Sequence, residues 1–203
     1  MPLTNHVAIF GGSFDPPHIG HEIAAIWLMS ALNAPVVEVV PTFEHCFGKE
    51  LADFDHRLEM CRLTFDKYDS LFARYSCEEQ GVFVNDIERK LPRPNITYNL
   101  VKAIQSETYY EDHEFAVIVG SDLVPELHTW ARWYEIADMV KIVALGRSGF
   151  ENAKTPLKIY QYPIELSAIS SSEIRDKVRR GKPITGLVPC NVEKYIYEKG
   201  LYT

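Results

Sequence analysis

A strand–helix–strand unit near the start of the chain is the feature that most constrains its fold. The apolar run Val7–Phe10, closed by two glycines, predicts a buried strand. A helix that is apolar on nearly all sides is expected from Ile19 to Leu32, and a second buried strand over Val36–Val40. Parallel strands joined by a helix are almost always connected by a right-handed crossover. The unit therefore predicts a parallel sheet with helices packed against it.

The same alternation continues along the chain. Further strands are expected over residues 83–84, 115–119 and 140–145, and further helices over residues 55–68, 97–106, 133–138 and 191–199. The Ser170-x-x-Glu173 pattern is a capping box, so another helix should begin at Ser171 and end at Gly181. We therefore expect a single α/β domain over residues 1–203, Rossmann-like, with a mainly parallel sheet and helices on both faces.

Composition and charge exclude several classes of protein. Hydrophobic residues make up 46% and charged residues 24% of the chain, which excludes a disordered protein. The formal net charge of −7 argues against bulk binding to nucleic acid or an anionic membrane, yet it allows a small phosphorylated ligand in a local positive pocket. No apolar run reaches the roughly 18–20 residues of a membrane span, and the start lacks the basic segment of a signal peptide. We expect a cytoplasmic protein, either monomeric or a homo-oligomer.

The segment Gly11–His21 carries the strongest chemical signal, because it leaves the first strand and enters the first helix. Glycines allow a ligand close to the backbone, and free N–H groups at a helix start favour phosphate. His18 and His21 are three residues apart and share one face of the helix. Ligands of parallel sheets bind beyond the carboxyl ends of the strands. We expect one crevice to be lined by the segments that follow Phe10, Val40, Val119 and Leu145.

Two other interpretations of this segment are open. The glycines and prolines could simply shape a turn that leaves His18 and His21 solvated. The His-x-x-His spacing also occurs in zinc sites, but no carboxylate lies at the usual spacing, since Glu22 points elsewhere on the helix. The four cysteines, at positions 46, 61, 77 and 190, form no Cys-x-x-Cys pair and are expected to be reduced thiols. We expect no metal site made of protein ligands.

A second candidate site lies at the start of the helix after residue 170. Capping explains Ser170 and Glu173, but it does not explain Arg175, one helical turn further on. An arginine beside the N–H groups of a helix start suits a polyphosphate, because its planar fork matches phosphate oxygens. Arg179 and Arg180 are instead expected on a solvated face of the helix.

Together these motifs resemble those of the nucleotidyltransferase superfamily that carries a His-x-Gly-His signature. Within it, Gly11–His18 is similar to the bacterial nicotinate (or nicotinamide) mononucleotide adenylyltransferases. The resemblance covers essentially the whole chain and keeps the order of the motifs. It is carried by His18-Ile19-Gly20-His21, Gly120-Ser121-Asp122, Thr129-Trp130, Ile169 through Arg175, and Val188-Pro189 through Gly200-Leu201-Tyr202.

The resemblance implies a reaction and a role for each motif residue. ATP and nicotinate mononucleotide would give deamido-NAD and pyrophosphate, a step of NAD biosynthesis, by direct attack of the mononucleotide phosphate on the α-phosphorus, with Mg²⁺ accompanying ATP. The implied catalytic residues are His18, His21 and Arg175, with His18 nearest the α-phosphate. The implied ATP-binding residues are Gly11, Gly12, Ser13 and Phe14 along the phosphate path, Ser171 and Ser172 at the β- and γ-phosphates, and Gly120 and Asp122 at the adenosine, where Asp122 would accept from a ribose hydroxyl.

The mononucleotide side departs from the family pattern. The loop after Pro41 has Glu44 through Lys49 where the family carries a Pro-Pro-His-Lys string, and His45 and Lys49 are candidate phosphate contacts. The family's Ser-Tyr-Thr segment is Asn95-Ile96-Thr97 here, and the usual Arg-Pro-Gly is Arg147-Ser148-Gly149. Thr97 fits by helix phase. Trp130 matches the tryptophan that stacks on the pyridine ring; the alternative is that Trp130 and Trp133 both belong to the core.

Two other functions are therefore kept open. The chain could be a superfamily member with another acceptor, such as nicotinamide mononucleotide or phosphopantetheine. It could also be a nucleotide-binding regulatory domain without turnover, although the intact His18, His21 and Arg175 argue against that. In each case the partners are small molecules.

Overall fold

The computed structural model describes residues 1–44, 50–68, 80–146, 158–162, 164 and 169–203. Its centre is a parallel sheet in which the strands follow the order β3-β2-β1-β4-β5-β6. The strands are β1 (His6–Gly12), β2 (Val36–Pro41), β3 (Gly81–Val84), β4 (Glu114–Gly120), β5 (Lys141–Leu145) and β6 (Tyr160–Tyr162). All paired strands are parallel, so the expected Rossmann-like sheet is confirmed.

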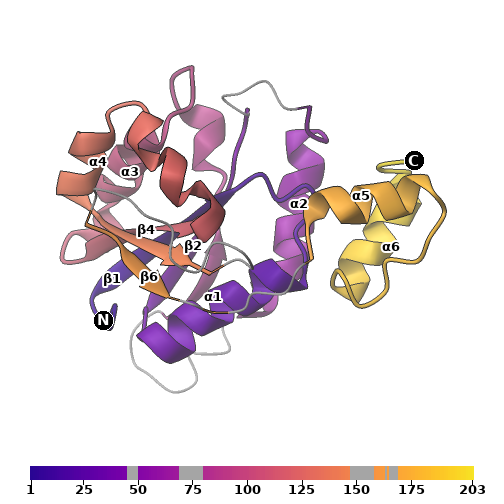
Figure 1. Cartoon of the computed structure of the whole chain (residues 1–203), viewed down its shortest axis with the longest axis horizontal. Helices are drawn as coiled ribbons and strands as arrows, with labels where there is room; N and C mark the ends of the chain where they lie inside the picture. The colour runs from indigo at the N-terminus through magenta and orange to yellow at the C-terminus, as the bar shows by residue number, and fades with distance from the viewer. Residues whose placement is uncertain (45–49, 69–79, 147–157, 163, 165–168) are drawn as a thin grey trace.

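The helices alternate with these strands, as expected (Figure 1). They are α1 (Ile19–Leu32), α2 (Phe54–Phe65), α3 (Thr97–Gln105), α4 (Trp133–Met139), α5 (Ser171–Arg179) and α6 (Cys190–Lys199). Short 3-10 turns occupy Asp66–Tyr68, Ile87–Lys90, Thr108–Tyr110 and Ser121–Thr129. The expected helix over 55–68 thus ends at Phe65 and continues as a 3-10 turn. The turn at Ser121–Thr129 and the short strand β6 were not expected from the sequence.

Side chains alternate between two hydrophobic cores, one on each face of the sheet. Ala8 of β1 faces a core that includes Leu28 of α1 and Phe65 of α2. The neighbouring Ile9 faces the other core, which includes Ile104 of α3 and residues of α4. Because consecutive strand residues point to opposite faces, this division places helices on both faces of the sheet.

A third, smaller core joins the last two helices to α2. Met60 of α2 packs with Ile174 and Val178 of α5 and with Val192 and Ile196 of α6. Figure 1 shows α5 and α6 together at one end of the molecule, beside α2 and away from the N-terminus. The C-terminal helices therefore reach the sheet through α2 and the loop between β1 and α1.

Two further findings concern membrane association and the cysteines. Within the described ranges, no helix combines the length and apolar character that crossing a membrane requires. Cys61 is buried in α2 and Cys190 is exposed at the start of α6, and both are free thiols. Cys46 and Cys77 lie outside the described residues.

Candidate active site

The strand order reverses between β1 and β4, and a cavity of about 280 Å³ lies at this point. Open parallel sheets bind ligands at such a switch point, beyond the carboxyl ends of the strands. The cavity brings together the two motifs that the sequence analysis singled out. Its walls come from the ends of β1, β4 and β5, the start of α1 and the start of α5, and include Gly11, Gly12, Ser13, Phe14, His18, His21, Gly120, Asp122, Ser171 and Ser172.

His18 and His21 are fixed by the geometry of the helix start. His18 is the N-cap of α1, and its backbone N–H donates to Nδ1 of His21 over 3.2 Å. An accepting Nδ1 leaves the N–H of a neutral His21 ring on Nε2. The two rings stack, with 3.7 Å between their centroids. The first amide of α1, that of Ile19, already donates to the Leu187 carbonyl over 3.0 Å. The Ile19 N–H is therefore already bonded and is not available to a phosphate at the start of α1.

Phe14 packs against the His21 ring and helps to fix its position. Its side chain is 1% exposed, and its ring meets the His21 ring edge-on with 5.0 Å between centroids. Phe10 and Phe65 make similar edge contacts with Phe14. Phe14 holds a left-handed backbone with φ of 46°, which is costly for a bulky residue and is sustained here by the packing of its ring. Phe14 is thus an anchor as well as part of the cavity wall.

The helix α5 begins where the capping box predicts. The Ser170 hydroxyl accepts from the Glu173 amide over 3.2 Å, and α5 starts at Ser171. The Ser171 hydroxyl donates to the Pro16 carbonyl over 2.9 Å. This bond connects the start of α5 to the loop between β1 and α1. Because the Ser171 hydroxyl uses its proton here, it can only accept further hydrogen bonds.

Arg175 lies behind this wall and is not among the residues that line the cavity. Its Nη1 donates to the Asp15 carbonyl over 2.7 Å, and its Nη2 donates to the Ser172 hydroxyl over 3.3 Å. Nη1 also lies 3.6 Å from the Asp15 carboxylate. The guanidinium is therefore held between the first motif and the second, one side chain away from the cavity.

Gly120 and Asp122 face each other at the end of β4. A Cβ on Gly120 would collide with Oδ1 of Asp122. Because glycine has no side chain, residue 120 leaves room for the Asp122 carboxylate beside the end of β4. Asp122 is half-buried and lines the cavity, as the position of Gly120-Ser121-Asp122 after the strand predicts.

Arg57, which no sequence motif singles out, holds together the loops that follow β1 and β2. Its side chain is 1% exposed. Nη1 donates to the carbonyls of Ser13 (2.9 Å) and Thr42 (2.7 Å), Nε to that of Ala52 (2.8 Å) and Nη2 to that of Phe43 (3.2 Å). Burial lowers the pKa of Arg57 from its ordinary value, but arginine stays protonated in proteins. Arg57 thus ties the loop after β1 to the loop after β2.

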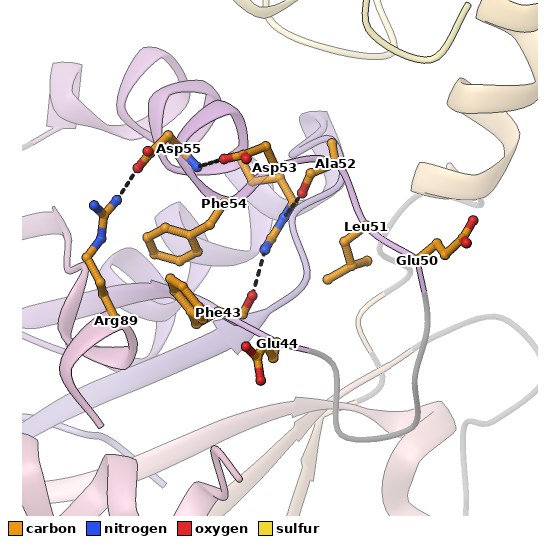
Figure 2. A pocket seen from close by; sticks show the side chains of 10 residues that line it. Phe43, Glu44, Glu50, Leu51, Ala52, Asp53, Phe54, Asp55 and Arg89 are labelled. Atoms are coloured by element: carbon orange, nitrogen blue, oxygen red, sulfur yellow. Dashed lines mark hydrogen bonds and ion pairs between the residues drawn. The ribbon is translucent and has the colours of Figure 1, made fainter. Parts of the chain in front are cut away.

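The described residues of the loop after β2, from Thr42 to Glu44 and from Glu50 to Asp53, are not among those that line the switch-point cavity, so the single crevice expected for all four strand ends is not seen for this part of the loop. This part of the loop borders a second hollow of about 650 Å³ between the loop and the start of α2. Figure 2 shows the Phe43 and Phe54 rings beside each other there, with 4.8 Å between centroids, and Arg89 paired with Asp55 at the edge. His45 and Lys49 belong to this loop but lie outside the described residues.

Thr97 and Trp130 lie on neighbouring segments outside the lining of the switch-point cavity. Thr97 is the first residue of α3, as expected. The Arg132 guanidinium lies 3.5 Å from the centroid of the Tyr98 ring, which holds the start of α3 beside the segment that carries Trp130. Trp133 is 2% exposed and belongs to the core, whereas Trp130 is half-buried and packs edge-on against it. The alternative that these tryptophans are core residues is therefore confirmed for Trp133.

The side chains available as metal ligands indicate which kind of cation the cavity could bind. In the described part of the chain, no group of three or more His, Cys, Asp or Glu side chains is placed to hold a metal ion. Glu22 is directed away from His18 and His21, toward the hydroxyl of Tyr68 (2.5 Å) and the ammonium of Lys67. The described residues of the cavity wall offer imidazoles, hydroxyls and one carboxylate, a set that suits a cation carried by a phosphate ligand.

Comparisons with known proteins agree with these motifs. Residues 9–177 match the family described as cytidylyltransferase-like. A protein of Anaeromyxobacter sp. (strain K) named "probable nicotinate-nucleotide adenylyltransferase" is 38% identical over the whole of this chain and 99% of its own length. A protein of the same name from Geobacillus thermodenitrificans is 34% identical over 97% of this chain and 85% of its own.

Solved structures share the fold. The nicotinic acid mononucleotide adenylyltransferase of Plasmodium falciparum, complexed with NaAD, has a TM-score of 0.76 at 22% identity and covers 98% of this chain and 97% of its own. A putative nicotinate-nucleotide adenylyltransferase from Vibrio parahaemolyticus has a TM-score of 0.66 at 20% identity, covering 98% of this chain and 95% of its own. The chain therefore belongs to the cytidylyltransferase-like family, together with relatives named as nicotinate-nucleotide adenylyltransferases.

Proposed function

We propose that the protein is a nicotinate-nucleotide adenylyltransferase, which transfers AMP from ATP to nicotinate mononucleotide and releases pyrophosphate. One observation carries this function: the cavity between the His18–His21 pair and the start of α5, in a chain that matches relatives of this name over its full length. The reaction joins two phosphates, and the product is deamido-NAD.

The chemistry is one of positioning and charge neutralisation. The mononucleotide phosphate is itself the nucleophile, and it attacks the α-phosphorus of ATP without a covalent enzyme intermediate. His18 contacts the reacting α-phosphate, and the Nε2–H of His21 donates to the polyphosphate. Ser13 and the backbone from Gly11 to Phe14 line the phosphate path. Transfer of this kind needs fixed donors where negative charge develops, and a cavity walled by imidazoles and hydroxyls provides them.

The remaining ATP contacts follow from the two other walls. At the start of α5, the Ser172 hydroxyl and the Ser171 backbone N–H hold the β- and γ-phosphates, because the Ser171 hydroxyl proton is already donated to Pro16. Arg175 neutralises the phosphates from behind Ser172. At the end of β4, Gly120 leaves room for Asp122, which accepts a hydrogen bond from a ribose hydroxyl. In this arrangement the adenosine lies toward β4 and the polyphosphate toward α5.

The mononucleotide side is proposed from the neighbouring segments. Trp130 stacks on the pyridine ring, and the N–H groups at the start of α3, around Thr97, receive the ring carboxylate. His45 and Lys49, in the loop after β2, contact the mononucleotide phosphate. The Arg132–Tyr98 contact supports this grouping, because it keeps Trp130 and Thr97 on adjacent segments.

Mg²⁺ is proposed to arrive with ATP. It would be held by phosphate oxygens and water rather than by a protein cage, which fits the scarcity of carboxylates in the cavity wall. When bound, it neutralises charge on the polyphosphate. We also propose that residues 1–203 act as one nucleotidyltransferase domain and that the enzyme works in the cytoplasm, because both proposed substrates are phosphorylated metabolites.

The test is a comparison of acceptors at saturating ATP and Mg²⁺, with the dinucleotide product separated and identified by chromatography. We expect kcat/KM to be higher for nicotinate mononucleotide than for nicotinamide mononucleotide. A helix start favours an anion over a neutral amide, and stacking on Trp130 does not discriminate between the rings. Equal values would contradict the role of the α3 start, and product from phosphopantetheine alone would contradict the function. Binding of ATP without any product would mean a silent nucleotide-binding domain.

A further inference from the structure

Tyr202 reaches from the C-terminal segment into the first motif. Its hydroxyl donates to Oδ1 of Asp15 over 2.7 Å, although the two residues are 187 positions apart. Tyr202 has a left-handed backbone with φ of 64°, and Gly200 before it has φ of 60°. These two turns direct the chain back toward α2, where the Tyr202 ring packs on the third core. A left-handed tyrosine is uncommon, and its hydrogen bond and ring packing hold it in place.

Asp15 is the point at which several segments meet. Its side chain is 1% exposed. Oδ1 accepts from Tyr202 and also from the Ala52 amide over 3.3 Å, just before α2. Oδ2 lies 3.6 Å from Nη1 of Arg175, which donates to the Asp15 carbonyl over 2.7 Å. The two carboxylate oxygens are thus divided: one serves Tyr202 and Ala52, and the other faces Arg175.

This division matters because a carboxylate and a bound polyphosphate compete for the same guanidinium. Arginine binds a carboxylate most strongly when both oxygens are free to accept two parallel N–H bonds. With Oδ1 occupied, Asp15 faces only Nη1, and Nη2 stays on Ser172 at the cavity wall. Burial, together with the negative charge of Asp15, raises the pKa of Tyr202, so its hydroxyl keeps the proton that it donates.

We propose that Tyr202 is a positioning residue for ATP binding: by occupying Oδ1 of Asp15, it keeps Arg175 directed toward Ser172 and the polyphosphate. The inference rests on the proposed function, which assigns Arg175 to the ATP phosphates. Without the hydroxyl, Oδ1 of the buried Asp15 keeps only the longer bond from the Ala52 amide, so it becomes open to a second hydrogen bond from Arg175. The guanidinium then turns away from Ser172, and the polyphosphate loses a positive charge directly behind the cavity wall.

The experiment measures the dissociation constant of MgATP by calorimetry in the absence of acceptor, together with kcat and KM. Tyr202→Phe keeps the ring and removes the hydroxyl. We expect it to weaken ATP binding about tenfold, the scale of one hydrogen bond to a charged group. Tyr195→Phe is the matched control, because that hydroxyl also belongs to the third core region but bonds to His56 (2.9 Å) rather than to Asp15. It should leave ATP affinity within about twofold of wild type, whatever it does to the melting temperature.

A double-mutant cycle separates positioning from mere stability. In an Arg175→Ala background, Tyr202→Phe should change ATP affinity by less than about twofold, because the group through which it acts is gone. A tenfold loss that persists in that background overturns the inference, as does a Tyr202→Phe protein with wild-type affinity. Since ATP binding is measured without the acceptor, a wild-type protein that binds ATP but makes no deamido-NAD would contradict the proposed function and leave this comparison valid.

Discussion

Gly20 lies directly against the imidazole of His18, since a Cβ on Gly20 would come within 3.0 Å of the ring atoms Cε1 and Nδ1. The position of the His18 ring therefore depends on the lack of a side chain at Gly20, the second residue of α1. An added methyl group would have to displace that ring by a few tenths of an ångström. Displacing the ring in this way tests whether the proposed contact of His18 with the α-phosphate depends on the exact position of its imidazole.

His18→Ala should lower kcat by about 10²–10³ while changing ATP affinity little, because a stabiliser of developing charge acts mainly in the transition state. Gly20→Ala should lower kcat in the same sense but by less, since the ring is moved rather than removed. Steady-state kinetics and a melting curve for each variant provide the measurement. A His18→Ala enzyme within a few-fold of wild-type kcat would contradict the role.

Arg175→Ala should raise the dissociation constant of ATP by on the order of tenfold, because it removes both the positive charge behind the cavity wall and the charged donor that holds the Ser172 hydroxyl. Arg175→Lys should rescue poorly. The guanidinium bonds the Asp15 carbonyl and the Ser172 hydroxyl through two different nitrogens, and a single ammonium cannot reproduce that fork. Calorimetric titration with MgATP measures both variants. Full affinity in Arg175→Lys would mean that charge alone is sufficient.

Arg57→Met should destabilise the fold by about 3–5 kcal/mol, because it leaves buried carbonyls of both strand-end loops without their charged donor. Urea unfolding followed by circular dichroism measures the change in the free energy of unfolding. Arg62→Met, on the same helix, is the control: Arg62 is exposed and, among the described residues, its ion pair is a 4.0 Å contact with Glu59. Its cost should stay below about 1 kcal/mol, and equal costs would refute the bracing role of Arg57.

His6 should make stability depend on pH. Burial lowers the pKa of His6, the nearby Lys141 lowers it further, and Glu114 opposes them. Below pH about 6.5, the unfolded chain takes up a proton at this histidine that the folded chain resists, so the free energy of unfolding falls with decreasing pH. Above that pH both forms are neutral and the contribution is constant.

The variant His6→Asn isolates this contribution. Burial raises the pKa of Glu38 and of Glu88, which gives an opposite slope as their protons are lost, but both residues are retained in the variant. The difference in unfolding free energy between wild type and His6→Asn, measured in urea from pH 7.5 to about 5.5, should therefore shift against the wild type as the pH falls. A difference that is constant across this range would contradict the assignment.

Local chemistry explains what could be predicted from the sequence. The start of α5 follows from Ser170 and Glu173, whose capping bond involves only three residues of separation. The bounds of α1 follow from its apolar run, and the end of α6 from Gly200, which is left-handed at φ of 60°. The strand order was not predicted in detail, but the alternation of elements was sufficient to indicate the sheet and its ligand-binding edge.

Features that depend on distant partners were missed for a physical reason. Arg57 lies on a helix like an ordinary surface arginine, and only the carbonyls of Ser13 and Thr42 from two other loops explain its burial. The short β6 has no apolar run of its own and exists through its pairing with β5. Asp15 lies within the first motif, but its contacts could not be predicted, because its partners Arg175 and Tyr202 come from the far end of the chain.

The bonds that close the cavity wall are all long in sequence: Ser171 to Pro16 spans 155 positions, Arg175 to Asp15 spans 160, and Tyr202 to Asp15 spans 187. Such contacts carry a large loop-closure entropy, because each one closes a long stretch of chain. They also join the sheet to the third core, the small cluster formed by Met60 and the residues of α5 and α6. Local opening of that core would separate the two motifs while both cores of the sheet persist. We therefore expect that, under mild denaturation, ATP binding is lost before secondary structure, so that the proposed catalysis is less stable than the fold that carries it.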